Sequence, residues 1–133
     1  MNWQEIWNKK GQTSNKSTLE ELLDINGFTS DSKSLPSNSW LDYIEKVSNK
    51  VSLKTSDRII EAGCGAGAFL YPLYQNGYKS IYGVDYAQTM VDSAKQIMPE
   101  ANFSVANISS LSFKDSSFDV LICNSVFLYL KSL

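Results

Sequence analysis

The sequence predicts an α/β fold in which a parallel sheet lies between layers of helices, in a three-layer α/β/α arrangement. In the second half of the chain, short apolar stretches typical of buried strands alternate with stretches of helical periodicity. Such alternation favours parallel strands that are joined by helices packed on both faces of the sheet. The chain has 133 residues, of which 43% are hydrophobic, so we expect at most one domain of this kind.

The first part of the chain predicts short helices rather than strands. Trp3, Ile6 and Trp7 recur at helical spacing, and we expect a helix over residues 2–10. A capping box, Thr18–Glu21, opens a second short helix, and Asn26-Gly27 ends it. A serine-rich linker with Pro36 follows. We therefore divide the chain into an N-terminal helical segment, residues 1–36, and a domain over residues 37–133.

The second part begins with a helix and continues as strands and helices in alternation. Trp40, Tyr43, Ile44 and Val47 predict an amphipathic helix from about Ser39 to Lys50. Strands are expected near residues 57–62, 80–85, 101–105 and 118–123, and helices near residues 66–76 and 87–97. Pro72 lies inside the first of these two helices and is expected to bend it.

Three glycines at alternate positions follow the first predicted strand. Gly63, Gly65 and Gly67 have no Cβ, so the backbone can approach a ligand closely there, and the helix that follows offers free N–H groups. Asp85 ends the second predicted strand, where a carboxylate can accept hydrogen bonds from both hydroxyls of a ribose. Together these residues predict a site for a cofactor that contains a nucleoside.

Two classes of cofactor fit these glycines. Gly63, Gly65 and Ala68 satisfy the loose dinucleotide pattern G-x-G-x-x-G/A, which is typical of a nicotinamide-dependent oxidoreductase. The tighter pattern, an acidic residue followed by three alternating glycines, starts at Glu61. The negative charge of Glu61 disfavours the pyrophosphate of a dinucleotide by repulsion.

The tighter pattern and the segments after it resemble class I S-adenosylmethionine-dependent methyltransferases. Glu61–Gly67 resembles the first motif of that family, and Gly83–Tyr86 followed by Met90 resembles the second. Ala106–Ile108 lies where the family usually has an Asp that accepts from the adenine amino group. Residues 111–126 resemble the approach to the fourth strand, that strand and its exit. The resemblance covers roughly residues 37–133.

The resemblance implies that the cofactor is S-adenosylmethionine and assigns residues to its parts. Glu61 would hold positive charge at the methionyl end, and the loop backbone at Gly63–Gly65 would lie against that end. Asp85 would bind the ribose, and it could also cap the N-terminus of the next helix. Tyr86 would cover the adenine, and Met90 is expected in the core with at most an edge contact.

Two asparagines complete the expected site. Asn107 replaces the family's usual Asp, and its amide oxygen can still accept a hydrogen bond, without the assistance of a charge. Asn124 follows the fourth strand, where such folds place ligands, although it fits a polar helix entry equally well. The full expected set is Glu61, Gly63, Cys64, Gly65, Asp85, Tyr86, Met90, Asn107, Ile108 and Asn124. No catalytic residue is assigned.

The resemblance also implies a Rossmann-like sheet of seven strands in the order 3-2-1-4-5-7-6. The chain supplies four of them, in the order 3-2-1-4, so we expect a truncated form of this fold. The fourth strand, Val120–Asn124, would then have an uncovered edge, which favours association with another chain. We therefore expect a homo-oligomer formed through this edge, and weak or no methyl transfer by the chain alone.

The predicted function is methyl transfer from S-adenosylmethionine to a small-molecule acceptor, in which the protein contributes mainly proximity and orientation. Three alternatives remain open: a non-catalytic S-adenosylmethionine-binding fragment, a protein-interaction module, and an NAD(P)-dependent oxidoreductase. The chain contains no histidine, so the commonest general base and the commonest transition-metal ligand are both missing, and no metal is expected.

Charge and composition argue against several partners. The net charge is −2 and Arg58 is the single arginine, so no basic stripe is available for a nucleic acid. Asn124–Phe127 lacks the prolines found in methyltransferases that act on DNA bases. No stretch is long and apolar enough to span a membrane. Cys64 and Cys123 are far apart in the sequence and indicate free thiols in a cytoplasmic protein.

Overall fold

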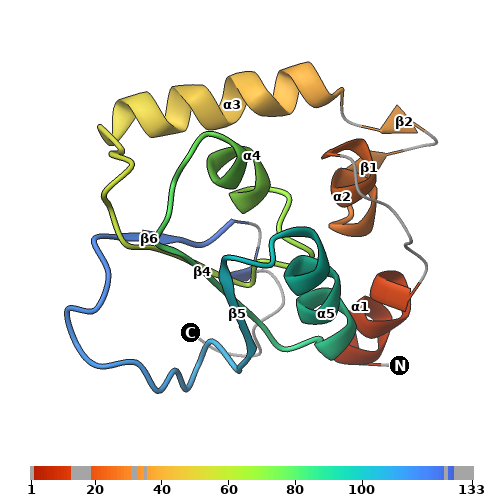
Figure 1. The fold of residues 1–133 in the computed structure, drawn as a ribbon. Coiled ribbons are helices and arrows are strands. Elements are labelled where there is room, and N and C mark those ends of the chain that lie inside the picture. Colours follow the sequence, from red (N-terminus) through yellow and green to blue (C-terminus); the bar gives the residue numbers. More distant parts are fainter. Residues whose placement is uncertain (1, 13–18, 31–32, 35, 125, 128–133) are drawn as a thin grey trace.

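A parallel sheet of four strands forms the centre of the computed structural model (Figure 1). The structure describes residues 2–12, 19–30, 33–34, 36–124 and 126–127. The sheet consists of β3 (Ile59–Ala62), β4 (Ile81–Asp85), β5 (Asn102–Val105) and β6 (Val120–Ile122). Their order across the sheet is β5-β4-β3-β6, which is the predicted order 3-2-1-4. The predicted α/β class, with its parallel sheet and strand order, is thus confirmed.

Five helices in the described part of the chain accompany the sheet. They are α1 (Trp3–Gln12), α2 (Leu19–Ile25), α3 (Ser37–Lys50), α4 (Leu70–Gln75) and α5 (Gln88–Ile97). The predicted linker differs, because it contains a small antiparallel pair, β1 (Thr29–Ser30) and β2 (Lys33–Ser34), and the first turn of α3. None of the helices in these described segments is long and apolar enough to cross a membrane.

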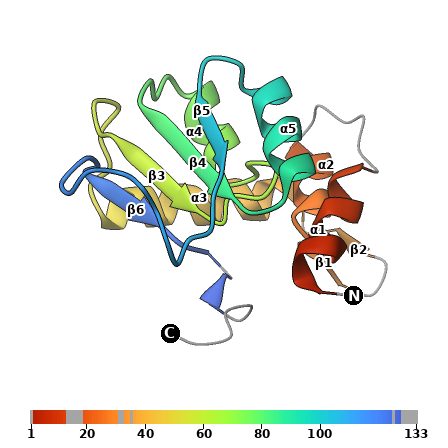
Figure 2. The same cartoon turned by 90° about the horizontal axis from the view of Figure 1, so that it is seen from below.

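The N-terminal helices pack onto the domain rather than standing apart from it. α1 lies against α5 (Figure 2). α2 buries Leu22 and Leu23 completely in the main core. It ends as predicted at Asn26-Gly27, where Gly27 has a φ of 82° and the N–H of Phe28 donates to the carbonyl of Leu23 at 2.9 Å. Thr18 of the expected capping box lies outside the described residues.

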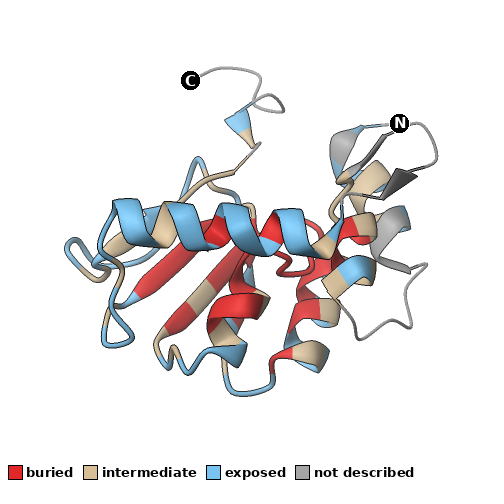
Figure 3. Ribbon diagram, turned by 90° about the horizontal axis from the view of Figure 1, so that it is seen from above, coloured by how far each residue is buried: buried red, intermediate tan, exposed pale blue. Residues whose placement is uncertain are grey.

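The main core fills the space between the helices and one face of the sheet. Ile59, Ile81 and Phe103 present that face, and Trp40 and Ile44 of α3 pack in the same cluster. α3 shows an exposed outer surface above the buried strands (Figure 3). Successive side chains of a strand point to opposite faces of the sheet. Every second residue of these strands therefore faces this core, and the residues between them face the other side.

The opposite face of the sheet has a smaller cluster formed by Ile60, Ala62 and Val84. Phe118 and Ile108, from the connection between β5 and β6, cover it. The rings of Tyr82 and Phe118 pack edge to face with centroids 5.0 Å apart. The described residues cover this face with a loop and do not form the helix layer that was predicted there.

Helix α4 is shorter than predicted, and it is not bent by Pro72. The helix begins at Leu70, so Pro72 lies in its first turn, where a missing N–H is tolerated. A helix that started at 66 would need an N–H at position 72 to pair with the carbonyl of Ala68. Instead, the indole N–H of Trp40 donates to that carbonyl at 2.8 Å.

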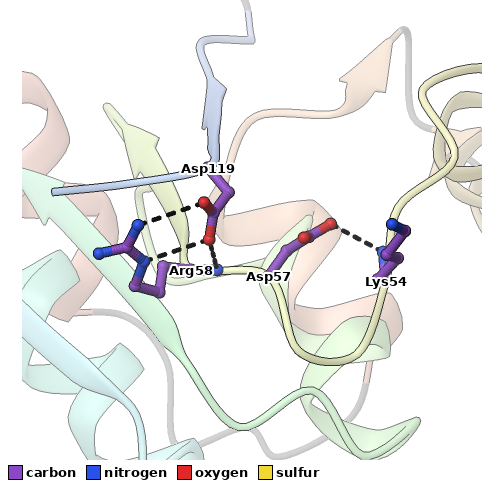
Figure 4. A network of polar contacts seen from close by, with 4 residues as sticks. All are labelled: Lys54, Asp57, Arg58 and Asp119. Atoms are coloured by element: carbon purple, nitrogen blue, oxygen red, sulfur yellow. Dashed lines mark hydrogen bonds and ion pairs between the residues drawn. The ribbon is translucent and has the colours of Figure 1, made fainter. Parts of the chain in front are cut away.

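An ion pair joins the beginnings of β3 and β6 (Figure 4). Asp119 accepts hydrogen bonds from the Arg58 backbone N–H at 2.8 Å and from the guanidinium Nε at 3.2 Å. The N–H of Asp119 in turn donates to the carbonyl of Arg58 at 2.8 Å. Asp57 instead accepts from the N–H of Lys54 at 2.8 Å and closes the preceding turn. Asp119 thus aligns the two neighbouring strands β3 and β6.

Candidate functional site

The glycine loop lies at the carboxyl end of the sheet, directly after β3. Gly63, Gly65 and Gly67 have φ values of 76°, 55° and 94°, which side chains with a Cβ rarely adopt. The N–H groups of Gly63 and Cys64 both donate to the carbonyl of Val84, at 2.8 and 3.0 Å. The loop is therefore tied to the end of β4 and keeps a defined shape.

Asp85 connects this loop to the start of the next helix. Its Oδ2 accepts from the N–H of Gly65 at 2.9 Å, and its Oδ1 accepts from the N–H of Ala87 at 3.0 Å. Burial raises the pKa of Asp85, and the backbone donors at Ala87, Gly65 and Tyr86 offset part of that rise. The carboxylate thus orders two loops and keeps acceptor capacity for a ligand.

Glu61 is the most unusual residue of the site. Its side chain is 3% exposed, and its Oε2 makes no hydrogen bond within the described residues. Burial, and then the nearby charge of Asp85, raise the pKa of Glu61 well above its ordinary value. A buried acceptor without a donor is costly and points to a missing partner. A cationic group, such as the ammonium of a methionyl moiety, fits that requirement.

Two expected site residues belong to the core through their side chains. Cys64 is fully buried, and burial raises the pKa of its thiol well above the ordinary value, so it is an unreactive space-filler. Met90 is 1% exposed within the main core cluster. The backbone of Cys64 remains part of the glycine loop, whereas Met90 supports α5 from within the core.

The remaining expected residues lie at the ends of the strands but have other neighbours. Tyr86 accepts a hydrogen bond at its carbonyl from the Gln4 side chain at 3.0 Å. Asn107 uses its Oδ1 to accept the N–H of Ser109 at 2.9 Å, which closes a turn. Ile108 packs on the second face of the sheet. Asn124 borders a hollow between β6 and α3.

The structure therefore brings together Glu61, the glycine loop and Asp85, while Asn107 and Ile108 belong to their own loop and to the second face. The end of the described chain approaches the same loop. A Cβ built on Gly63 would collide with the side chain of Val126. The segment after β6 thus covers part of the glycine loop, and this closeness explains why a glycine is needed at 63.

One residue of the site was not predicted from the sequence. Asn26, at the end of α2, accepts the N–H of Ala66 with its Oδ1 at 2.8 Å and donates from Nδ2 to the carbonyl of Cys64 at 3.3 Å. A Cβ on Gly65 would lie 2.6 Å from Asn26 Oδ1. The sequence showed Asn26 only as part of a helix end, and nothing local signals a contact 40 residues away.

Comparisons with known proteins agree with this geometry. Residues 60–133 match the family described as a methyltransferase domain. EEF1A lysine methyltransferase 4 of Mus musculus is 33% identical over 70 residues, which cover 50% of this chain and 27% of that protein. Trans-aconitate 2-methyltransferase of Delftia acidovorans is 36% identical over 62 residues, which cover 46% and 23% of the two chains.

A solved structure has a similar fold. The S-adenosylmethionine-dependent methyltransferase of Thiobacillus denitrificans, determined with S-adenosyl-L-homocysteine, has a TM-score of 0.62 at 14% identity. The match covers 100% of this chain and 48% of that one. The chain thus spans less than a third of the two curated relatives named above and about half of this structure. Because the family match includes the glycine loop, Asp85 and β6, the chain belongs to the S-adenosylmethionine-dependent methyltransferase domains.

Proposed function

We propose that this protein transfers a methyl group from S-adenosylmethionine to a small-molecule acceptor. The observation that supports the proposal most directly is the buried Glu61 carboxylate, whose Oε2 makes no hydrogen bond within the described residues. It lies two residues before the first of the positive-φ glycines, which leave the loop backbone open to close approach. A cofactor with a cationic amino-acid end suits this combination, and a pyrophosphate does not.

In this proposal each residue of the site has a binding or orienting task. Glu61 holds the cationic methionyl end, and the backbone of the glycine loop lies alongside it. Asp85 keeps Gly65 and Ala87 in place and uses its remaining acceptor capacity for the ribose. S-adenosylmethionine, when bound, supplies an electrophilic methyl group on a sulfonium. Orientation of the acceptor towards such a group can be worth about 7–11 kcal/mol.

Two observations support a small-molecule acceptor: the net charge of the chain, and the lack of the proline motif found in methyltransferases that act on DNA bases. The net charge is −2, and Arg58, the single arginine, is paired with Asp119. Asn124–Phe127 lacks the prolines expected of an enzyme that acts on DNA bases. A protein lysine is the competing acceptor, because three of the relatives are named as methyltransferases of eEF1A lysine. The acceptor assay below distinguishes the two.

Calorimetric titration tests the cofactor. We expect S-adenosylmethionine and S-adenosylhomocysteine to bind, and NAD and NADP not to bind. Asp85→Ala should weaken binding by about 1.5–3 kcal/mol, the range for hydrogen bonds that involve a charged partner. Asp92→Ala, which removes an exposed carboxylate on α5, is the matched control and should leave the affinity unchanged. Binding of NAD with no response to S-adenosylhomocysteine would replace this proposal with the oxidoreductase alternative.

A radiolabelled-methyl assay tests the reaction itself. Label transferred into a small-molecule pool supports the proposal, and label found only in protein would overturn the proposed acceptor class. Firm cofactor binding without transfer to either pool would favour the non-catalytic alternative. The Asp85→Ala protein should lose transfer in proportion to its lost cofactor affinity when the cofactor is below saturation.

A further inference from the structure

The glycine loop is held from two sides, by the sheet and by the N-terminal segment. On the sheet side, Asp85 accepts the N–H of Gly65. On the other side, the Asn26 amide reaches the residues on either side of Gly65: it accepts from Ala66 at 2.8 Å and donates towards Cys64 at 3.3 Å. The side chains of Asp85 and Asn26 therefore hydrogen-bond to the backbone of three consecutive loop residues, Cys64–Ala66.

Asn26 can act as a fixed support because its own position is well determined. Leu22 and Leu23 of α2 are completely buried in the main core, which anchors the helix. The N–H of Asn26 donates to the carbonyl of Leu22 at 2.9 Å, so Asn26 still belongs to the last helical turn. Gly27, with φ of 82°, then turns the chain away and leaves the Asn26 side chain directed at the loop.

The Asn26 amide satisfies both loop groups at once. The Ala66 N–H needs an acceptor and the Cys64 carbonyl needs a donor, and an asparagine side chain supplies one of each. The close fit also accounts for Gly65, since a Cβ there would lie 2.6 Å from Asn26 Oδ1. The loop conformation and the Asn26 side chain thus depend on one another.

We propose that Asn26 is a positioning residue that sets the conformation of the cofactor loop, so that cofactor affinity depends on the N-terminal segment. This inference rests on the proposed cofactor-binding function of the loop. A loop arranged before the ligand arrives costs less to order on binding, and this lowers the dissociation constant. Asn26 itself needs no contact with the cofactor for this effect.

The chain offers a matched control for the test. Asn76-Gly77 ends α4 in the same way, with Gly77 at φ of 87°, but Asn76 is exposed and α4 leads away from the glycine loop towards β4. Asn26→Ala and Asn76→Ala therefore make the same change in the same kind of helix end. Only the first removes the contacts with Ala66 and Cys64.

Two measurements on each protein decide the matter. The first is the hydrogen-exchange rate of the Ala66 amide without ligand, and the second is the dissociation constant for S-adenosylhomocysteine. We expect Asn26→Ala to speed the exchange and to raise the dissociation constant about tenfold, the scale of two ordinary hydrogen bonds. Asn76→Ala should change neither. Circular dichroism confirms that each variant is folded.

Asn26→Asp separates the two contacts and serves if Asn26→Ala does not fold. It keeps an acceptor for Ala66, so exchange there should stay slow, but it loses the donor to Cys64 and should still weaken binding. Unchanged affinity in folded Asn26→Ala would overturn the proposal, and so would unchanged exchange at Ala66. If the wild-type protein fails to bind S-adenosylhomocysteine, the proposed function fails instead, and the Ala66 exchange still decides whether Asn26 orders the loop.

Discussion

At the scale of single residues, Glu61 shows a conflict between stability and binding. Its carboxylate is buried beside Asp85, and burial followed by the charge of Asp85 raises its pKa well above the ordinary value. At neutral pH the folded protein must either ionise this group and leave Oε2 without a donor, or hold a proton on it. A cationic ligand removes the conflict.

The pH dependence of stability follows from these shifts. Glu61 and Asp85 both have raised pKa values when folded, so between their unfolded and folded pKa values the native state binds more protons than the unfolded chain. The free energy of unfolding should therefore fall as pH rises from the ordinary carboxylate range through the folded pKa values. Asp119 acts in the opposite direction, because its hydrogen bond with Arg58 lowers its pKa, but its contribution is lost only below the ordinary aspartate range.

Glu61→Gln should stabilise the ligand-free protein and weaken cofactor binding. The amide keeps the shape of the side chain and removes the charge that burial opposes. We expect the melting temperature at neutral pH to rise by roughly 2–8 °C, the shift for about 1 kcal/mol in a domain of this size, and its fall with pH to become shallower. Differential scanning fluorimetry from pH 5 to pH 8 measures both effects.

The control for this prediction is Glu45→Gln, the same substitution at an exposed position of α3. It should leave the melting temperature and its pH dependence as they are. A Glu61→Gln protein that is less stable than the wild type at neutral pH would contradict the account of Glu61, since it would mean that the carboxylate has a partner in the folded state.

Some residues of the site could be predicted from the neighbouring sequence, and others could not. Glu61, the three glycines and Asp85 could be predicted because they lie at the carboxyl ends of β3 and β4 or directly after β3, and strand ends in a parallel sheet meet at one edge. The N–H of Ala106 donates to the carbonyl of Asp85, so Asn107 lies one residue beyond the contact with β4, and its amide oxygen accepts from the N–H of Ser109. Asn26 could not be predicted, because its contact with the loop depends on how α2 packs in three dimensions.

At the scale of elements, α4 and α3 depend on each other through one hydrogen bond. Pro72 has no N–H for the carbonyl of Ala68, and Trp40 of α3 supplies the indole N–H instead, at 2.8 Å. Trp40 is 4% exposed and packs edge to face on Phe69 with centroids 6.0 Å apart. The sequence pattern predicted both helices, but the start of α4 at Leu70 reflects this contact between them.

Trp40→Phe should therefore destabilise the protein mainly by leaving the Ala68 carbonyl buried and unpaired. We expect a loss of about 1–3 kcal/mol in the free energy of unfolding, measured by urea denaturation. Adding Pro72→Ala should recover part of this loss, because residue 72 then has an N–H that can pair with Ala68 as the helix extends. No recovery in the double variant would indicate that lost ring packing, rather than the carbonyl, dominates.

At the scale of the whole molecule, the two faces of the sheet differ in what could be predicted. The helices on the Ile59 face follow from hydrophobic periodicity, since each has a clear apolar stripe. The covering of the Ile60 face does not, because it comes from scattered aromatic residues in a serine-rich connection. Phe113, Phe118 and Tyr82 stack edge to face there without any regular spacing.

The two edges of the sheet also differ, and this leads to a prediction of self-association. β6 pairs with β3 alone among the described strands, and Leu121 in its centre is 65% exposed. Phe127, just beyond it, is 58% exposed. An apolar strand edge with free backbone groups is a ready site for pairing with a second copy. Light scattering over a range of concentrations should therefore show a mass that rises above that of the monomer.

Lysine substitutions on the two edge strands locate the contact. Leu121→Lys places a charge on the β6 edge and should return the protein to a monomer, since charged side chains on edge strands oppose pairing. Val105→Lys makes a similar change on β5, where the residue is 44% exposed, and should leave association as in the wild type. Association lost equally in both variants would mean that added charge, rather than the β6 edge, controls it. A wild-type protein that stays monomeric at high concentration would rule the contact out.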